Sequence, residues 1–281
     1  MKNLKGKVSV IIPAYNEAGS IAENIEETVR VFDEFGCKYE IIVVDDGSRD
    51  DTYNQALKAA GQRAVVGLPI AQAAGQRAVV GLPIAQATSP HSNIIVKQIK
   101  HNRGKGRALK VGFRLASGDY VVFLDADMEL HPAQIQTFFD IMRLDEADVV
   151  IGSKRHPNSR LEYPLDRRII SSVYFFLIKL FFGLPIQDTQ TGLKLFKYEV
   201  LKKVFPRILV KAFGYDLEIL VNVHRMGFKI AEAPIVLDTQ RYGRIGMNSI
   251  WTTWRDTMAI WYRTYVLRYY DRFDHRRGKR R

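Results

Sequence analysis

The chain has 281 residues, of which 47% are hydrophobic and 26% are charged, and its formal net charge is +12. The charged fraction is ordinary for a soluble globular protein, and the apolar residues suffice for one large core or two small ones. The single cysteine, Cys37, excludes an internal disulfide framework and fits a reducing compartment. The positive charge favours a polyanionic partner, which can be nucleic acid, a phosphorylated substrate or an anionic membrane.

Short apolar segments alternate with amphipathic segments through the first half of the chain. We expect strands over Val8–Ile12, Ile41–Val44, Asn93–Ile99, Tyr120–Leu124 and Asp148–Ile151. We expect helices over Ser20–Phe35, Asp50–Ala59, Lys105–Ala116 and Pro132–Leu144. This alternation predicts an α/β protein with a Rossmann-like, mostly parallel sheet that is covered by helices on both faces.

Residues 60–87 do not fit this alternation. The segment AGQRAVVGLPIAQA at residues 60–73 recurs unchanged at residues 74–87. Two copies of so short a unit are too few for a solenoid, and loops tolerate insertions well. We therefore interpret residues 60–87 as a tandem-duplicated surface loop inserted between a helix and a strand.

The second half of the chain is less regular and contains two segments suited to a membrane interface. We expect helices over Leu165–Phe182, Phe213–Met226 and Asn248–Tyr270, and a strand over Lys229–Val236. The first and last of these helices combine apolar or aromatic residues with arginine and lysine, as amphipathic C-terminal interface helices do. The alternative is that both are core helices.

No segment is predicted to span a bilayer. The best candidate, Val173–Ile186, is interrupted by a lysine, ends at a glycine and a proline, and is too short. Residues 1–7 show no secretion signal, and residues 275–281 form a basic tail that would be attracted to anionic lipid. We therefore expect peripheral attachment at the cytoplasmic face of a membrane.

Three carboxylates follow the strand Tyr120–Leu124 at alternate positions: Asp125, Asp127 and Glu129. A chain that leaves a sheet can aim alternate side chains the same way, so these oxygens can converge on one hard cation. Proteins bind nucleotide diphosphates through Mg²⁺ or Mn²⁺, which is coordinated by a few carboxylates and by phosphate oxygens. The alternative interpretation is a solvated acidic turn.

Other polar clusters are predicted at the same edge of the sheet, where α/β proteins bind ligands. Tyr15-Asn16-Glu17 and Asp45-Asp46 follow two of the predicted strands. The loop Asn102–Gly106 supplies glycines for close backbone approach and Lys105 to face a phosphate, although its spacing is not that of a Walker A loop. For Asp46-Gly47-Ser48, turn formation is an equally good explanation.

The order and spacing of four motifs resemble family 2 glycosyltransferases with the GT-A fold. The motifs are Val10–Glu17 (VIIPAYNE), Val43–Thr52 (VVDDGSRDDT), Asn102–Gly106 (NRGKG) and Asp125–Asp127 (DAD). Later segments narrow the resemblance to dolichyl-phosphate sugar synthases, and to the glucose branch more than the mannose branch. These are Gly152–Arg155, Arg167–Ser171, Asp188–Phe196 and Tyr215–Leu220.

The resemblance implies transfer of a hexose, with inversion, from a nucleotide diphosphate sugar to a polyprenyl or dolichyl phosphate. UDP-glucose is the favoured donor and GDP-mannose is possible, with Mg²⁺ or Mn²⁺ as cofactor. Residues 1–245 would form the catalytic domain, with an interface helix at residues 165–183, and residues 246–281 would form a second interface helix and the basic tail. An anionic acceptor phosphate needs little help from a general base, whereas the leaving diphosphate needs charge neutralisation.

The resemblance also implies roles for individual residues. Pro13, Tyr15, Glu17 and Asp45 would frame the nucleoside, and Asp125, Asp127 and Glu129 would hold the metal, although the family often has glutamine at the third position. Phosphate groups would be held by Lys105, Arg155, Arg167, Arg168, Arg241 and Arg244. Lys154 and Arg155 compete for one of these roles.

The second half of the site would contain Asp188, Gln190 and one carboxylate from the predicted helix Phe213–Met226. Asp216 and Glu218 are both candidates. Because positions i and i+2 of a helix face different ways, we expect only one of them to point inward, and we favour Asp216. Asp127, Asp188, Asp216 and Arg155 are therefore the predicted catalytic residues.

Two other functions remain open from the sequence. A glycosyltransferase of the same fold can use an acceptor that is not a lipid. A basic RNA-binding protein would also explain the net charge, but strands that end in carboxylates line an RNA backbone poorly, so we expect no nucleic-acid partner.

Overall fold

The computed structural model describes residues 1, 4–61, 93–160, 165–210, 214–237 and 247–273. Nearly all of the tandem repeat at residues 60–87 lies outside the described residues, as does the basic tail at residues 275–281. The predicted surface position of the repeat therefore stays a prediction.

Seven strands form one sheet in the order β3-β2-β1-β4-β6-β5-β7. They are β1 (Lys7–Ala14), β2 (Lys38–Asp45), β3 (Ile94–Gln98), β4 (Tyr120–Phe123), β5 (Val149–Ser153), β6 (Lys194–Lys197) and β7 (Ile230–Pro234). All neighbouring pairs are parallel except those of β6, which runs antiparallel to both β4 and β5. The predicted α/β class with a mostly parallel sheet is confirmed.

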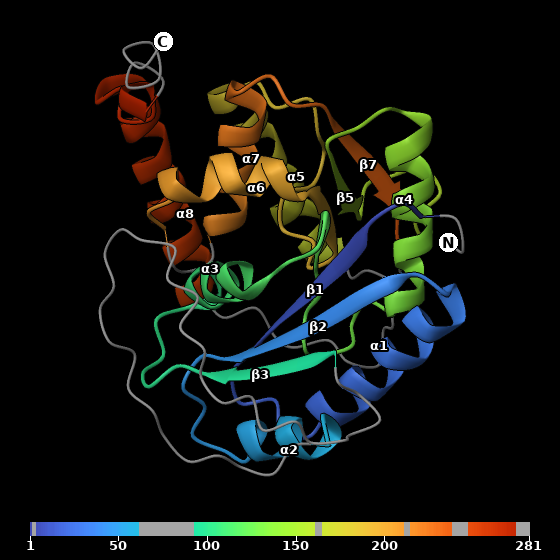
Figure 1. The fold of residues 1–281 in the computed structure, drawn as a ribbon. Helices are drawn as coiled ribbons and strands as arrows, with labels where there is room; N and C mark the ends of the chain where they lie inside the picture. The colour runs from blue at the N-terminus through green and yellow to red at the C-terminus, as the bar shows by residue number, and fades with distance from the viewer. Residues whose placement is uncertain (2–3, 62–92, 161–164, 211–213, 238–246, 274–281) are drawn as a thin grey trace.

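Helices cover both faces of this sheet (Figure 1). One face carries α1 (Ile21–Phe35), α2 (Thr52–Ala59), the short η1 (Pro132–Gln134) and α4 (Ile135–Leu144). The other carries α3 (Lys105–Leu115), α6 (Tyr198–Val204), η2 (Phe205–Arg207) and α7 (Tyr215–Arg225). Along β2, Ile41 and Val43 enter the first core and Ile42 and Val44 the second, which explains its unbroken apolar run.

The sequence interpretation missed β6 and α6. β6 has only four residues, two of them lysines, so it carries neither a continuous apolar run nor a clear alternation. Its pairing makes it central: Lys194 lies opposite Phe123 of β4 and Ile151 of β5. Because β6 is antiparallel to β4, its first residue lies beside the last residue of β4, at the edge where the predicted ligand-binding loops gather.

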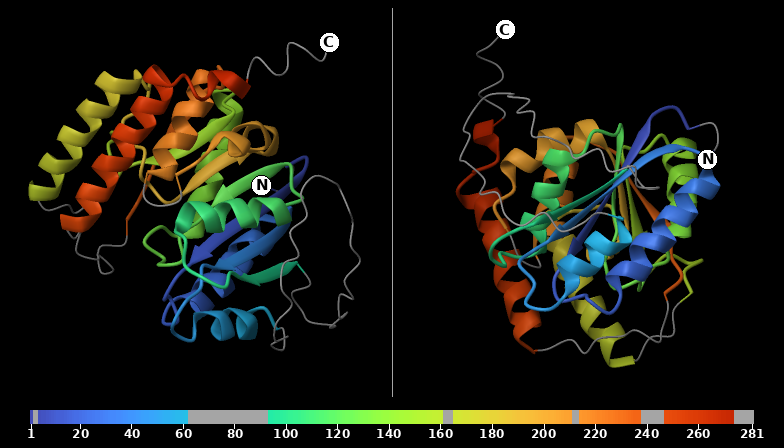
Figure 2. Two further views of the ribbon diagram at one scale, coloured as in Figure 1. Left: turned by 90° about the vertical axis from the view of Figure 1, so that its left-hand side faces the viewer. Right: turned by 60° about the horizontal axis from the view of Figure 1, so that its bottom comes forward.

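Two helices lie side by side at one end of the molecule (Figure 2). They are α5 (Leu165–Phe182) and α8 (Met247–Trp261), joined by a hydrogen bond of 3.1 Å between the hydroxyls of Tyr174 and Thr257. The rings of Phe181 and Trp261 also pack together, 6.3 Å apart between centroids. No helix in the described ranges is long and apolar enough to cross a membrane.

The predicted helix over Asn248–Tyr270 was wrong in its extent. The α-helix ends at Trp261, and a π-helical turn, η4 (Tyr262–Val266), follows it. Arg268 then has a left-handed φ of 46°, which an α-helix does not accommodate. Beyond this point Tyr270 is buried against the body of the protein, whereas Tyr262 and Tyr265 in the π-helical turn stay about half exposed.

A glycine sets the distance between α3 and the sheet. A Cβ built on Gly112 would overlap Cγ2 of Ile11 in β1 and lie 3.3 Å from Cγ2 of Val44 in β2. The close approach of α3 matters for function because this helix begins with Lys105.

We predict that Gly112→Ala lowers the free energy of unfolding by about 1–3 kcal/mol, because overpacking outweighs the better helix propensity of alanine. Urea unfolding measures this. The control is Gly19→Ala, since nothing lies within 4 Å of a Cβ on Gly19. Equal unfolding midpoints for the two variants would contradict the packing argument.

Candidate active site

Polar side chains from both halves of the chain meet at the carboxyl edge of the sheet. β4 leads into Asp125, Asp127 and Glu129, and α3 brings Lys105 toward them. The antiparallel β6 adds Lys194, and α7 adds Asp216. The site is therefore built from segments that are about 100 residues apart in the sequence.

Asp125 is the most constrained carboxylate of this group. Its Oδ1 forms an ion pair with Nζ of Lys105, and its carbonyl oxygen accepts a hydrogen bond of 2.8 Å from Asn24 of α1. Burial would raise the pKa of Asp125, but Lys105, and more weakly Lys194 and Lys154, hold it below its usual value. Asp125 is therefore charged at neutral pH and held in place on two sides.

The other carboxylates of the loop after β4 concentrate negative charge. Burial and then Asp125 raise the pKa of Asp127. Burial also raises the pKa of Glu129, against the opposing effect of Lys154 and with the support of Asp127 and Asp125. The pKa of Glu17, after β1, is raised by burial and by the same two aspartates. These groups lie close enough to repel one another, which is the condition that a bound cation relieves.

The loop between Asp127 and Glu129 is held in a tight turn. Oδ1 of Asp127 accepts a hydrogen bond of 3.0 Å from the amide of Glu129. Met128 between them has a left-handed φ of 60°, an unfavourable conformation for a residue with a side chain. Such backbone strain is often found at functional sites, and here it fixes the direction of the acidic side chains.

The donor set fits a hard divalent cation that also binds phosphate. In the described part of the chain, no three acidic, histidine or cysteine side chains come together as a complete metal site. Asp125 and Asp127 instead lie two residues apart in the loop after β4, close enough for Asp125 to raise the pKa of Asp127, and Lys105 pairs with Asp125. Mg²⁺ is commonly held by one or two carboxylates and the phosphates of a substrate, so a partial site is what a nucleotide-dependent cation needs.

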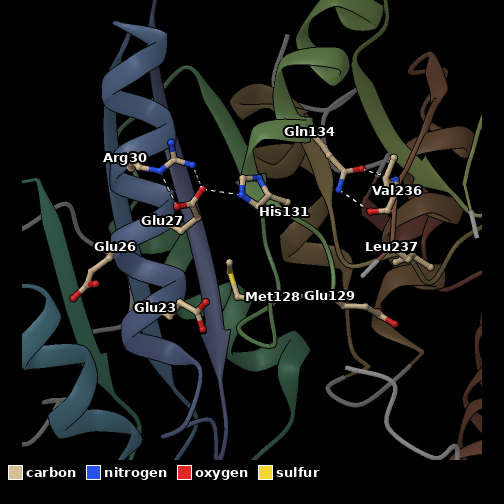
Figure 3. Close-up of a pocket in the computed structure, with 10 residues that line it drawn as sticks. All are labelled: Glu23, Glu26, Glu27, Arg30, Met128, Glu129, His131, Gln134, Val236 and Leu237. Carbon is tan, nitrogen blue, oxygen red and sulfur yellow. Dashed lines mark hydrogen bonds and ion pairs between the residues drawn. The ribbon is translucent and has the colours of Figure 1, made fainter. Parts of the chain in front are cut away.

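A cleft of about 890 Å³ lies on the other side of this loop, between α1 and η1 (Figure 3). Glu27 of α1 bonds to Arg30 and pairs with Nε2 of His131 at 2.7 Å across the cleft. Other lining residues include Glu23, Glu26 and Glu129. With so many carboxylates on its walls, this cleft is unsuited to an anionic ligand such as a diphosphate.

Asp216 forms a buried ion pair beneath the site. Its Oδ1 lies 2.6 Å from Nζ of Lys194, and the side chains are 7% and 1% exposed. Lys194 also donates a hydrogen bond to the carbonyl of Thr191. Burial raises the pKa of Asp216, and Lys194 and Lys105 only partly offset it. Lys194 lies in the segment Asp188–Phe196, but the sequence alone did not identify it as a residue of the site. Its signal in the sequence is a single lysine within an apolar segment.

Asp216 and Glu218 are both buried, but they face different partners, and Asp216 pairs with Lys194 of the site. Glu218 accepts hydrogen bonds from the amides of Leu209 and Val210 at 2.9 and 2.7 Å, and from the hydroxyl of Tyr270. The two side chains do leave α7 in different directions, but the helix is covered on both sides. Glu218 holds the C-terminal segment in place, whereas Asp216 faces the site.

Near the predicted nucleoside site, the acidic side chains of Asp45 and Asp46 accept hydrogen bonds from other residues of the protein. Asp45 is fully buried and accepts hydrogen bonds from Ser48 and, at 2.9 Å, from Gln98. Asp46 accepts from the amides of Arg103 and Gly104 at 3.1 and 2.6 Å, which orders the loop before α3. Asp46 thus orders a loop that is distant in the sequence, whereas the local turn bonds of this segment run from Ser48 to Asp45.

The remaining predicted nucleoside residues lie at the end of β1. Pro13 is buried within β1, whereas Tyr15 after it is 37% exposed. A ring that is exposed at the ligand-binding edge is available to stack on a base. The predicted role of Tyr15 is compatible with this position.

Asp188 organises the loop that precedes β6. Its Oδ2 accepts hydrogen bonds from the amide of Lys154 at 3.0 Å and from the hydroxyl of Thr191 at 2.9 Å, and its Oδ1 accepts from the amide of Gln190. The loop then passes Asp125 so closely that a Cβ on Gly192 would overlap its carboxylate. Asp188 therefore organises a loop that passes beside Asp125, and the roles of Asp188 and Gln190 in the site stay predictions.

Of the five predicted phosphate-binding arginines, the structure describes the side chain of Arg155 alone. The guanidinium of Arg155 lies over the ring of Phe175, 5.0 Å from its centroid, and donates a hydrogen bond of 2.8 Å to Ser172. Arg155 thus ties the end of β5 to α5. Arg167 and Arg168 lie in α5, but their side chains are outside the described part. Arg241 and Arg244 lie outside the described residues altogether.

The sequence model of Glycosyl transferase family 2 matches residues 9–72 and 83–205, which is more than half of the chain. The match contains the acidic loops after β2 and β4, Lys105 and β6. The chain belongs to this family. The interruption of the match at residues 73–82 falls within the tandem repeat.

Curated relatives share about 28% of their residues with this chain. Dolichyl-phosphate beta-glucosyltransferase of Dictyostelium discoideum is 28% identical over 239 residues, which cover 81% of this chain and 65% of that protein. The Saccharomyces cerevisiae enzyme of the same name is 27% identical, with coverage of 81% and 66%. Glycosyltransferase AglD of Haloferax volcanii is 28% identical, with coverage of 82% and 32%. The chain thus spans less than two thirds of the length of these relatives.

Solved structures confirm the predicted GT-A fold. Glucosyl-3-phosphoglycerate synthase of Mycobacterium tuberculosis, in complex with Mn²⁺, UDP and glucosyl-3-phosphoglycerate, matches with a TM-score of 0.64 at 19% identity. The match covers 91% of this chain and 78% of that one. A complex of the same enzyme with Mg²⁺ and UDP gives a TM-score of 0.63. At this identity, the likeness concerns the fold alone.

We predict that Lys194→Met lowers the free energy of unfolding by about 3–5 kcal/mol at pH 7, because Asp216 is left buried without a partner. The loss should shrink as the pH falls toward about 4, since the pKa of Asp216 in the folded variant lies above its unfolded value and protonation then favours the folded state. Urea unfolding between these pH values measures the effect.

The double variant Lys194→Met/Asp216→Leu is the matched control, because it removes both charges. It should recover most of the stability and lose the pH dependence. A double variant as unstable as the single one, or a loss that is equal at every pH, would contradict the buried ion pair.

Proposed function

We propose that this protein transfers glucose from UDP-glucose to a polyprenyl phosphate, with inversion and with Mg²⁺ or Mn²⁺ as cofactor. The observation that carries the proposal is the group formed by Asp125, Asp127 and Lys105 at the carboxyl edge of the sheet. It offers both carboxylates for a cation and an ammonium for a phosphate, as a nucleotide diphosphate requires. The names of the relatives, over 81% of this chain, support the donor sugar and the lipid acceptor.

In the proposed reaction, an oxygen of the acceptor phosphate attacks the anomeric carbon of the sugar. The bond from that carbon to the diphosphate breaks, and UDP leaves with the electron pair. The acceptor phosphate is already anionic at neutral pH, so no side chain needs to remove a proton from it. When bound by Asp125 and Asp127, the cation supplies charge neutralisation to the diphosphate.

The protein's own residues bind and orient the two substrates. Lys105 contacts the diphosphate, and Asp188 holds the loop over Asp125.

Arg155, positioned on Phe175 of α5, faces the acceptor phosphate, and Arg167 and Arg168 of α5 are further candidates for this contact. Asp216 acts by fixing Lys194 and by adding negative charge near Lys105. Tyr15 and Pro13 contact the nucleoside, and Glu17 and Glu129 add to the negative field around the cation.

A second function uses the same donor site with an acceptor that is not a lipid. A structural neighbour with the same fold, glucosyl-3-phosphoglycerate synthase, was crystallised with phosphoglyceric acid, which is an anion without a lipid. Both functions have an anionic acceptor oxygen, so the donor half of the site does not distinguish them. The acceptor class is decided by whether radiolabelled sugar enters the organic phase or stays in water.

We predict that Asp127→Ala loses transfer activity by about 100-fold or more, because the developing charge on the diphosphate loses a cation ligand. The assay incubates the protein with radiolabelled UDP-glucose, polyprenyl phosphate and Mn²⁺ and counts the organic extract. The variant loses one hydrogen bond, so its unfolding free energy should fall by only about 1 kcal/mol.

Asp140→Ala is the control, since Asp140 is a surface carboxylate of α4 paired with Arg143. Its activity should equal that of the unmodified protein. Turnover of the Asp127 variant at the control's rate would refute the metal site. No product in either phase from a panel of sugar nucleotides would refute the proposed function.

We further propose that the α5–α8 pair lies in an anionic membrane interface, so that the protein is attached peripherally at a cytoplasmic membrane face. Phe176 and Leu180 of α5 are 65% and 67% exposed, and Trp251 of α8 is 68% exposed. Lys179 and Arg255 are exposed on the same two helices. Exposed apolar side chains together with basic ones are the composition that interfacial helices use.

We predict that Phe176→Ser/Leu180→Ser weakens binding to anionic vesicles roughly 100-fold or more, since burying each side chain stabilises the bound state by about 1.5–3 kcal/mol. Co-sedimentation with vesicles measures it. Leu144→Ser is the control, because Leu144 is 76% exposed but lies on α4. Equal loss in both variants, or no loss in the double variant, would exclude this surface.

A further inference from the structure

The two lysines at the site are held in different ways. Lys194 is 1% exposed and is fixed by Asp216 and by the carbonyl of Thr191. Lys105 is 34% exposed at the start of α3, and its ammonium contacts Oδ1 of Asp125. Lys194 is therefore fixed in the core. Lys105 can move from Asp125 to another anion without any unfolding of the protein around it.

Lys105 occupies one of the two carboxylate oxygens of Asp125, a residue that the cation would use. Its ammonium contacts Oδ1 of Asp125, and it interacts electrostatically with Asp127 and Asp216 as well. A divalent cation at Asp125 and Asp127 would meet a positive charge at contact distance from one of its own ligands. Two cations repel one another strongly at such a distance, so they cannot share this carboxylate without loss.

Binding of a donor diphosphate removes the repulsion between Lys105 and the divalent cation. The oxygens of the diphosphate offer Lys105 an anionic partner on the outer side of the loop, and they also supply the ligands that complete a cation site. Lys194 does not move, so the negative charge of Asp216 stays neutralised while Lys105 leaves Asp125.

We propose that Lys105 is a placeholder cation: it neutralises Asp125 in the free protein and moves to the diphosphate of the donor, so that the diphosphate and the divalent cation bind cooperatively. This inference rests on the proposed function for the class of donor. By linkage, UDP tightens the binding of the cation by the same factor as the cation tightens the binding of UDP.

Binding of Mn²⁺, followed through the EPR signal of the free ion, tests the proposal without any turnover. In the unmodified protein, saturating UDP should tighten Mn²⁺ binding by about 5–150-fold, the usual range of coupling between sites. Lys105→Met keeps the length of the side chain and removes its charge. It should bind Mn²⁺ more tightly than the unmodified protein when UDP is absent, and UDP should tighten it much less.

Two further variants separate this effect from a general change of charge. Arg114→Gln removes a positive charge from the exposed last turn of the same helix, and it should leave both Mn²⁺ affinities unchanged. Lys105→Arg keeps the charge at the site, so its Mn²⁺ affinity without UDP should stay as weak as that of the unmodified protein. Circular dichroism confirms that each variant is folded.

The outcomes distinguish the failure of this inference from the failure of the proposed function. If Lys105→Met binds Mn²⁺ alone no more tightly than the unmodified protein, or if UDP tightens both by the same factor, Lys105 is not a placeholder, although the protein can still be a UDP-dependent transferase. If the unmodified protein binds no UDP even with Mn²⁺ present, the proposed donor and this inference both fail.

Discussion

The site depends on the neutralisation of carboxylates that the fold brings together. Asp125, Asp127 and Glu129 follow β4, and Asp216 lies in the first turn of α7. Burial, together with repulsion from Asp125, raises the pKa values of Asp127, Glu129 and Asp216. Two lysines of the protein neutralise part of this negative charge. Lys194 is buried against Asp216, and Lys105 is paired with Asp125 at the surface of the site. The pKa values of Asp127 and Glu129 remain raised after this pairing, so negative charge is still concentrated beside Asp125.

The antiparallel strand β6 makes this arrangement possible. A parallel strand beside β4 would place its carboxyl end at the site and its first residue at the far edge of the sheet. Because β6 runs the other way, the loop that precedes it arrives directly over Asp125, and its first residue, Lys194, lies opposite Phe123. One reversal of direction therefore supplies both the counter-ion of Asp216 and the loop that is organised by Asp188.

The first turn of α7 joins the site to the helix pair at the end of the molecule. Asp216 points toward the lysines of the site, whereas Glu218 accepts bonds from Tyr270 and Arg263 beyond α8. The amide of Gly214 also donates to Asp256 of α8, and a Cβ at Gly214 would lie only 2.6 Å from Cβ of that residue. A surface proposed to meet lipid and a site proposed to act on a lipid phosphate are thus fixed to the same short segment.

The sequence by itself determined the α/β class, the strands that end in acidic loops and the place of Lys105, because short apolar runs and the residues that follow them are local features. It did not determine β6, whose four residues take their strand conformation from β4 and β5 on either side. Nor did it determine the orientation of Asp216 and Glu218. A helical wheel separates them, but only the tertiary structure decided that α7 is covered on both sides, so that both carboxylates are buried and each finds a different partner. The end of α8 was decided in the same way, because Tyr270 packs back on α7 after the π-helical turn and its hydroxyl donates to Glu218.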